Sequence, residues 1–430
     1  AEDGIRDAQE SRGLGDVYKR QINRLNVDED WQTFLYEAAQ WDNPEIAELL
    51  VHRGFDIKSV MYNLDNESLN IADENDDADA ATGANENNGP DCGNTLLHIA
   101  AENNSPNMVR FLIGHGADID AKNIDKKTPL HLAIETRNDE IAKIFIESGS
   151  NINYVDKEEN TLLHLASEYG LPEIIRILIN MKLNIDMGNK HGETPLYFAI
   201  ANGNPETAKI LLENNASIDF VDKDKNTLLH LASQNGLKEI VQIIINKLPK
   251  DNIENYINTI NRFGDTPLHV AAKRGHSEII QILIDNNAEI NARNNREETP
   301  LHLAACENRR EALEILIQNG ADINARSADW DWSTPLHLAI SGNPDEPIVP
   351  IVQILVNTRG IDINAKDKTG NTPLHIAAFC RNAAILRILT EVPGININLQ
   401  NDCEETPLHI AACSGNKEGV QILINIPGIN

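Results

Sequence analysis

Thirteen histidines give this sequence its most obvious chemical capacity, because an imidazole can bind a metal ion or exchange a proton near neutral pH. Nine of them occupy the fourth position of a recurring phrase, Thr-Pro-Leu-His-Leu-Ala-Ala or a near copy: His98, His131, His164, His230, His269, His302, His337, His375 and His409. Successive copies begin about 33 residues apart, so each histidine belongs to its own structural unit, whereas metal ligands must converge on one point. A further copy has Tyr197 in this position. We therefore predict a structural role for these histidines.

Two other groups of residues resemble metal sites in composition. Cys403, His409 and Cys413 lie close together in the sequence, but their spacing matches no common zinc motif. The acidic stretch that begins at Asp73 resembles a calcium-binding loop in its composition. However, Ala78 and Ala84 stand where such a loop requires Gly and Glu. We expect neither zinc nor calcium to bind.

The sequence also lacks the short motifs that place reactive groups in many enzymes. It contains no glycine-rich phosphate-binding motif of the Walker or dinucleotide type, and no G-x-S-x-G nucleophile motif. Paired carboxylates occur only at surface positions that recur with the repeat. We predict that the chain is not an enzyme and needs no cofactor.

The copy that begins at Thr299 shows which structure the repeat encodes. Thr299 is a favourable N-cap, and Pro300 suits the first position of a helix, where no backbone N–H is needed. Residues 301–305 give one apolar face of a short helix, residues 312–317 form a second and more apolar helix, and Gly320 allows the left-handed conformation that ends it. Neither helix is long enough to be stable alone, so neighbouring units must stack.

From about residue 31 to residue 430, the phrase and its period resemble the ankyrin repeat. The resemblance implies an all-α fold, a solenoid in which helix-turn-helix-hairpin units stack into a curved superhelix. It also implies that each histidine ring is hydrogen-bonded to the Thr hydroxyl and to neighbouring backbone, and so holds its loop against the helix. Proteins of this family usually bind other proteins and rarely carry out chemistry themselves.

The N-terminal part of the chain departs from this pattern. Residues 11–21 read SRGLGDVYKRQ, the in-frame translation of a transposase adapter used in sequencing libraries, so we interpret residues 1–21 as an assembly artefact. Residues 22–59 contain a degenerate first repeat, and residues 60–90 form an acidic insert that we expect to be disordered. Residues 91–430 hold ten repeats, of which the last is cut short, so we expect the chain to be a fragment.

The composition restricts the partners. The formal net charge of −29 disfavours nucleic acid and anionic membrane surfaces. No apolar run approaches the ~20 residues that a membrane-spanning helix needs. The five cysteines show no paired disulfide framework, which is typical of a reducing compartment. We expect a monomer without membrane insertion, in the cytoplasm or delivered into the cytoplasm of a host cell.

Candidate binding residues follow from the positions that vary in designed ankyrin proteins: the hairpin tip, the residue before the Thr and the pair after Ala-Ala. Here these positions hold aromatic and basic side chains in a few repeats, and exposed Trp and Arg are common anchors of protein interfaces. The lengthened hairpin of residues 327–333 contains two of the four tryptophans, whose rings either bind a partner or cover adjacent helix ends. We predict a protein-binding surface made of Trp330, Trp332, Phe263, Lys273, Arg274, Arg293, Arg296, Arg326 and Phe379.

The sequence therefore predicts a non-catalytic scaffold or adaptor that binds a partner protein along a concave surface of hairpin tips and first helices. A second interpretation stays open: the array is the targeting or regulatory part of a larger enzyme or secreted effector, such as a ubiquitin-ligase subunit or a kinase, whose catalytic part lies outside this fragment. A third is the cytoplasmic array of a membrane channel or a cytoskeletal anchor.

Overall fold

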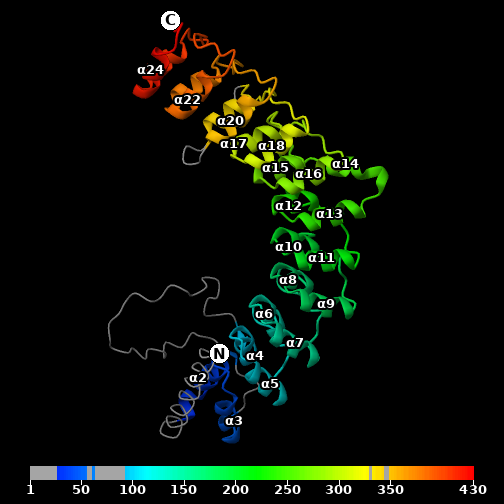
Figure 1. Ribbon diagram of the computed structural model, residues 1–430. Coiled ribbons are helices and arrows are strands. Elements are labelled where there is room, and N and C mark those ends of the chain that lie inside the picture. The colour runs from blue at the N-terminus through cyan, green and yellow to red at the C-terminus, as the bar shows by residue number, and fades with distance from the viewer. Residues whose placement is uncertain (1–26, 56–60, 63–92, 329–331, 343–347) are drawn as a thin grey trace, which may run out of the picture. The chain divides into compact units, whose positions relative to one another are not determined.

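The computed structural model describes residues 27–55, 61–62, 93–328, 332–342 and 348–430. Our predictions for residues 1–21, for the calcium-like loop and for Trp330 lie outside these residues. The described residues are mostly α-helical (Figure 1). They divide into two compact units, of which the N-terminal one ends at Ser217 and the C-terminal one begins at Ile218.

The N-terminal unit consists of helix pairs, each with a first and a second helix. Its first helices are α2 (Val27–Gln40), α4 (Leu96–Glu102), α6 (Pro129–Glu135), α8 (Leu162–Glu168) and α10 (Pro195–Ala201). Its second helices are α3 (Pro44–His52), α5 (Pro106–Gly114), α7 (Asp139–Glu147), α9 (Pro172–Asn180) and α11 (Pro205–Glu213). First helices pack on first helices and second helices on second helices, which gives two parallel rows within the unit (Figure 1).

A two-stranded ladder precedes α4. Strand β1 (Met61–Tyr62) pairs in antiparallel orientation with β2 (Asn94–Thr95). β1 belongs to the segment that we delimited as the acidic insert, residues 60–90, and the rest of that segment lies outside the described residues.

The C-terminal unit repeats the same arrangement. Its first helices are α12 (Leu228–Gln234), α15 (Pro267–Arg274), α17 (Pro300–Cys306), α19 (Pro335–Ser341), α21 (Pro373–Phe379) and α23 (Pro407–Cys413). Its second helices are α13 (Lys238–Lys247), α16 (Ser277–Asp285), α18 (Arg310–Gln318), α20 (Val349–Asn357), α22 (Ala383–Thr390) and α24 (Lys417–Ile424). Where the interval between copies of the phrase lengthens after α13, the extra residues form the 3-10 turn η1 (Lys250–Asn252) and the short helix α14 (Ile253–Ile257).

The helices begin, end and pack as the sequence predicts. Thr299 is the N-cap of α17, Pro300 is its first residue, and Gly320 follows α18 with a φ of 90°. The pair Ala304 and Ala305 is buried, and such small side chains let the first helices approach one another closely. Isoleucine and leucine of the second helices fill the rest of the core. The predicted all-α repeat solenoid is confirmed.

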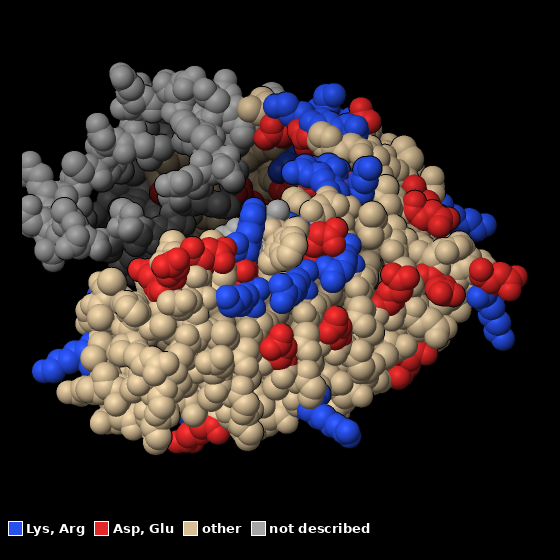
Figure 2. All heavy atoms as spheres, turned by 90° about the horizontal axis from the view of Figure 1, so that it is seen from above, with Lys and Arg blue, Asp and Glu red and all other residues tan. Residues whose placement is uncertain are grey.

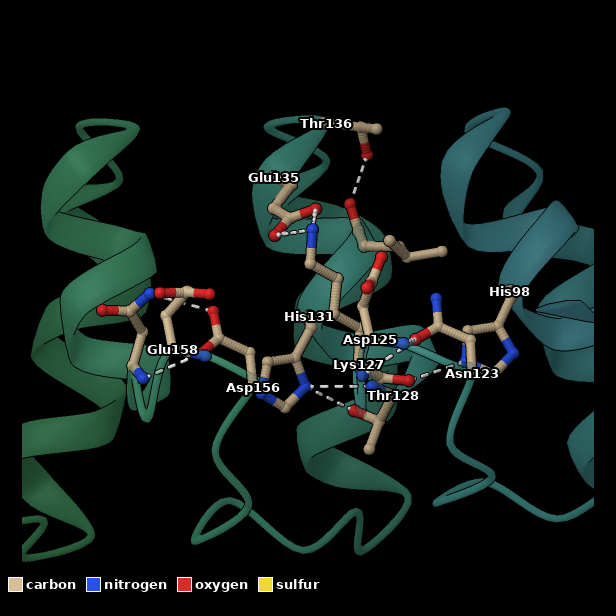
Figure 3. A network of polar contacts seen from close by, with 12 residues as sticks. His98, Asn123, Asp125, Lys127, Thr128, His131, Glu135, Thr136, Asp156 and Glu158 are labelled. Atoms are coloured by element: carbon tan, nitrogen blue, oxygen red, sulfur yellow. Dashed lines mark hydrogen bonds and ion pairs between the residues drawn. The ribbon is translucent and has the colours of Figure 1, made fainter. Parts of the chain in front are cut away.

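Each histidine of the phrase caps its own helix. Nδ1 of His302 accepts a hydrogen bond from the backbone N–H of Thr299 at 3.0 Å and lies 2.9 Å from the Thr299 hydroxyl oxygen. Thr128 and His131 make the same contacts (Figure 3). Because Nδ1 accepts this bond, the proton of the neutral ring must be on Nε2.

The protonated Nε2 reaches the next repeat. Nε2 of His302 donates to the backbone carbonyl of Ser333, the residue before the next Thr, at 3.2 Å. The equivalent bond is made by His98, His164, His230, His269, His337 and His375. The buried Nε2 of His131 is an exception, with no hydrogen-bond partner among the described residues. The sequence indicated contacts around the ring's own loop, whereas the structure shows that the ring also joins consecutive repeats.

A second set of polar contacts joins consecutive hairpins. At the base of one hairpin, Nδ2 of Asn294 donates to Oδ1 of Asp265 at 2.8 Å. On the second-helix side, Oδ1 of Asn324 accepts from the backbone N–H of Asp362 and Nδ2 of Asn324 donates to the Gly360 carbonyl, both at 2.8 Å. These side chains satisfy backbone groups of the hairpins, which form no continuous sheet. The interior of the repeat thus fixes the position of each hairpin.

Replacement of a repeat histidine should destabilise the fold more when the ring is buried between repeats than when it is exposed to solvent. We predict that His302→Ala lowers the free energy of unfolding by about 2 kcal/mol, because it removes bonds to two repeats. His409→Ala is the matched control, since His409 makes the same bonds to Thr406 but is exposed to solvent, and we expect a smaller loss. Urea unfolding followed by circular dichroism measures both, and equal losses would contradict the role of the ring between repeats.

The stability of the array should also depend on pH through these rings. Burial lowers the pKa from 6.5 to about 4 in four of them: His98, His131, His230 and His302. The unfolded chain takes up a proton below pH 6.5 and the folded ring does not, so the stability from each neutral ring is complete above pH 6.5 and is lost as the pH falls towards 4. For one ring the loss between pH 7.5 and pH 5 is about 2 kcal/mol.

The variant His302→Ala isolates this effect, because it lacks one titrating ring. We predict that the difference in unfolding free energy between the wild type and this variant is smaller at pH 5 than at pH 7.5, by about 2 kcal/mol. Denaturant titrations at both pH values measure it. A difference that does not change with pH would show that the folded ring titrates like an exposed one.

Candidate functional site

The hairpin tips that precede the first helices are joined through their backbones. The N–H of Lys157 donates to the carbonyl of Asp125 at 3.0 Å, and the N–H of Arg262 donates to that of Asp224 at 2.8 Å. The side chains of the same residues form ion pairs, at 3.6 Å between Lys157 and Asp125 and at 2.9 Å between Arg262 and Asp224. In these tips the charges therefore cancel in pairs.

The residue types that face one another change at the tips before α17 and α19. The backbone contacts continue, since Asn295 donates its N–H to the carbonyl of Phe263 at 3.0 Å and Ala328 donates to that of Arg296 at 3.2 Å. Neither Asn295 nor Ala328 carries a charge. Phe263 and Arg296 occupy the position that holds an aspartate in the paired tips, so an aromatic ring and a cation replace two carboxylates.

The tips before α15 and α17 border a groove of about 380 Å³, called here the tip groove, which is lined by Phe263, Asp265, Lys273, Asn294, Asn295, Arg296, Glu298, Leu303, Cys306 and Glu307. Phe263 and Arg296 come from the tips, and Lys273 comes from the end of α15. Leu303, which is buried, and Cys306, which is half-buried, come from α17 and form the base. Burial raises the pKa of the Cys306 thiol, so the base is uncharged. Three of the predicted binding residues thus line one groove.

The charged side chains of the tip groove differ in exposure. Lys273 and Arg296 are exposed, whereas Glu298 is buried and Asp265 is half-buried. Both carboxylates accept hydrogen bonds from Nδ2 of Asn294, at 2.8 Å for Asp265 and 3.0 Å for Glu298. The fully exposed charged side chains of the groove are therefore Lys273 and Arg296, while Asp265 and Glu298 are bound within the hairpins and Glu307 is half-buried at the end of α17.

The other predicted basic residues do not line the tip groove. Arg274 and Arg326 are exposed. The guanidinium of Arg293 donates to the carbonyl of Arg326 at 2.7 Å and to that of Glu297 at 3.0 Å, so it braces two neighbouring hairpins, a structural role that the sequence did not indicate. In the space-filling view, Lys and Arg side chains gather in a band with Asp and Glu beside it (Figure 2).

Two further predicted aromatic residues are exposed outside the groove lining. The exposed fraction is 66% for Phe379, at the end of α21, and 54% for Trp332. Trp332 has a φ of 63°, in the left-handed region, where the tips before α15 and α21 have Gly264 and Gly370. This conformation is unfavourable for a bulky residue and acceptable for glycine. Other tips nevertheless place long charged residues in the same conformation, among them Lys126 and Glu297, so this position does not require glycine.

The N-terminal unit contains a set of polar residues that our sequence reasoning missed. The residue that follows the last two residues of the phrase is glutamate in three copies of the N-terminal unit, Glu102, Glu135 and Glu168, and Ala201 in a fourth. In the C-terminal unit the same position holds Gln234, Lys273, Cys306, Ser341, Phe379 and Cys413. Nζ of Lys127 lies 2.8 Å from the Glu135 carboxylate (Figure 3). Burial raises the pKa of all three glutamates. Comparison of this single position across all copies would have revealed the change in its chemistry.

The structure offers no evident centre for metal chemistry in the part of the chain that it describes. No three His, Cys, Asp or Glu side chains there are grouped so that they could hold an ion. Cys403, His409 and Cys413 are all exposed. Within the same residues, every helix is too short or too polar to cross a membrane.

Comparison with protein families agrees with this architecture. The model described as ankyrin repeats (3 copies) matches residues 66–156, 148–222 and 229–327. The model for ankyrin repeats (many copies) matches residues 316–377 and 354–411, and that for a single ankyrin repeat matches residues 403–430. The search of curated proteins gave no match. The matched residues cover well over half of the sequence and coincide with the helix pairs, so the chain belongs to the ankyrin repeat family.

Proposed function

We propose that this protein is a non-catalytic scaffold or adaptor that recognises a partner protein through hairpin tips and first helices of its C-terminal unit. The observation that carries the proposal is the tip groove, where Phe263 and Arg296 occupy the tip position that holds an aspartate in the paired tips and Lys273 lies beside them at the end of α15. Membership of the ankyrin family supports it, because ankyrin repeats are generally protein-interaction modules.

The composition of the tip groove suits a protein interface. Phe263 is 49% exposed, and the guanidinium of Arg262 lies 5.0 Å from its ring centre. Aromatic and basic side chains beside an apolar base are the groups that contribute most to binding energy in protein interfaces. A partner side chain seated over Leu303 and Cys306 would remove apolar surface from water.

We further propose that the protein acts as a monomer in the cytoplasm, its own or that of a host cell. A protein is favoured over nucleic acid as the partner, because the net charge of −29 repels a polyanion. If the array serves to target a larger enzyme, it would use the same recognition surface.

A comparison of the proteins retained from a cell lysate by the immobilised full chain and two variants tests this proposal. Phe263→Ala combined with Lys273→Ala removes the ring and one cation of the tip groove. Arg310→Ala is the matched control, because it removes an exposed cation from α18, outside the groove. We expect at least one protein to be retained by the wild type and by the control but not by the groove variant. Identical retention by all three proteins would contradict the proposal.

Trp332 should contribute to binding but little to stability. We predict that Trp332→Gly changes the free energy of unfolding by less than about 1 kcal/mol, because release of the left-handed backbone offsets the lost burial of the ring. We also predict that it weakens binding of the retained partner by about 2 kcal/mol. Thermal unfolding and a binding titration measure the two effects. An unchanged affinity would show that this hairpin does not bind the partner, and the surface around Phe379 would then be the next candidate.

A further inference from the structure

The polar side chains that join one repeat to the next are of three kinds, and all three change at one place in the chain. We infer that this place, the boundary between Ser217 and Ile218, divides the array into two parts that unfold separately. Each repeat of such an array is stabilised by its interfaces with its neighbours, so a weak interface separates two cooperative parts.

The first kind is the imidazole of the phrase. In the repeat of α8, Nδ1 of His164 accepts from the backbone N–H of Thr161 at 3.0 Å, and Nε2 donates to the carbonyl of Glu193 in the next repeat at 2.9 Å. The repeat of α10, the last before the boundary, has Tyr197 in this position. A phenol has no ring nitrogen, so the N–H of Thr194 lacks this acceptor and no ring nitrogen is present to donate to the following hairpin.

The second kind is an amide at the base of the hairpin, five residues before the Thr of the phrase. Its Nδ2 donates to the side chain that precedes the Thr of the previous repeat, as Asn261 does to Asn226 at 2.8 Å. At the boundary the corresponding residues are Asp222 and Glu193. A carboxylate has no N–H to donate, and two like charges at these positions repel each other.

The third kind is the ion pair between hairpin tips, exemplified by Arg262 with Asp224 at 2.9 Å. At the boundary the corresponding residues are Lys223 and His191, and neither is an anion. The attraction between opposite charges that joins other tips is therefore absent from this pair of residue types.

The loss of all three kinds together distinguishes the boundary from the junctions within each unit. From α4 to α10 and from α12 to α23, every junction keeps at least one of them. The junction of α6 with α8 lacks the ring bond of His131 but keeps the ion pair of Lys157 with Asp125. The junction of α17 with α19 keeps the ring bond of His302.

Opposite charges remain only on the second-helix row. Lys209 and Glu239 occupy the positions of Arg176 and Glu206, which form an ion pair at 3.1 Å between α9 and α11. Both side chains of that pair are exposed, and water weakens the attraction between exposed charges. A pair of this kind does not replace the bonds of the ring and the amide, whose donor side chains are buried.

Two features lower the stability of the N-terminal unit. His131 is buried there, and its Nε2 has no hydrogen-bond partner among the described residues. Burial also raises the pKa of Glu102, Glu135 and Glu168, so their ionised forms reduce the stability of the folded unit at neutral pH. We therefore expect the N-terminal unit to open first, while the C-terminal unit and its tip groove stay folded.

Hydrogen exchange of the full chain in increasing urea, followed by mass spectrometry of its peptides, tests this division. We expect helices α4 to α11 to exchange as one group at lower urea, and helices α12 to α24 as a second group at higher urea. The exchange rates of the two groups should differ about tenfold or more before the first group opens. Exchange of the whole array as one group, or a division at another place, would overturn the inference.

A variant that combines Tyr197→His, Asp222→Asn and His191→Asp restores all three kinds of side chain at the boundary. We expect the two groups to merge and exchange in α10 and α11 to slow about tenfold or more, because several hydrogen bonds are gained. Tyr197→His alone should slow exchange in α10 to a smaller extent. Asp367→Asn is the matched control, since it makes the same change at the hairpin before α21, and it should leave two groups. Two groups that persist in the combined variant would show that these residues do not cause the division.

Discussion

The rest of the structure depends on a neutral imidazole at the fourth position of the repeated phrase. His302 illustrates the constraint: Nδ1 accepts from the backbone of Thr299, which places the proton on Nε2, and Nε2 donates to Ser333 in the next repeat. A charged ring would lose the acceptor at Nδ1. Burial, which lowers the pKa of His302 to about 4, keeps the ring neutral. One side chain therefore both starts a helix and positions the hairpin that follows.

Because these contacts fix the interior of each repeat, chemical variety is concentrated at the hairpin tips and at the end of the first helix. In the N-terminal unit these positions hold partly buried glutamates and paired charges, exemplified by Glu135 with Lys127 and by Lys157 with Asp125. In the C-terminal unit, Phe263 interrupts that pattern and the tip groove appears. The residues that fix the repeat are thus different from those of the surface that we propose for recognition, so that surface can vary without loss of the contacts that hold the repeat together.

The helices and the fold could be predicted from the sequence, because they depend on the order of residues within one repeat. The N-cap Thr299, the helix-starting Pro300 and the period of the phrase act within one repeat, and they predicted the helices and the fold. Phe263, Lys273 and Arg296 were selected because they occupy variable positions, and they do line one groove. Contacts between repeats were not predictable. The spacing of the phrase does not reveal which carbonyl a ring or guanidinium reaches, so the bracing role of Arg293 and the bond from Nε2 of His302 required the structure.

The central claim is that these histidines are neutral, with the proton on Nε2, while the array is folded. Nitrogen-15 chemical shifts of the imidazole rings, recorded at pH 6 on the full chain, report both charge and tautomer. We predict neutral rings with the proton on Nε2 for His98, His230 and His302, which donate to the following repeat. Charged rings at this pH, or protons on Nδ1, would contradict the account.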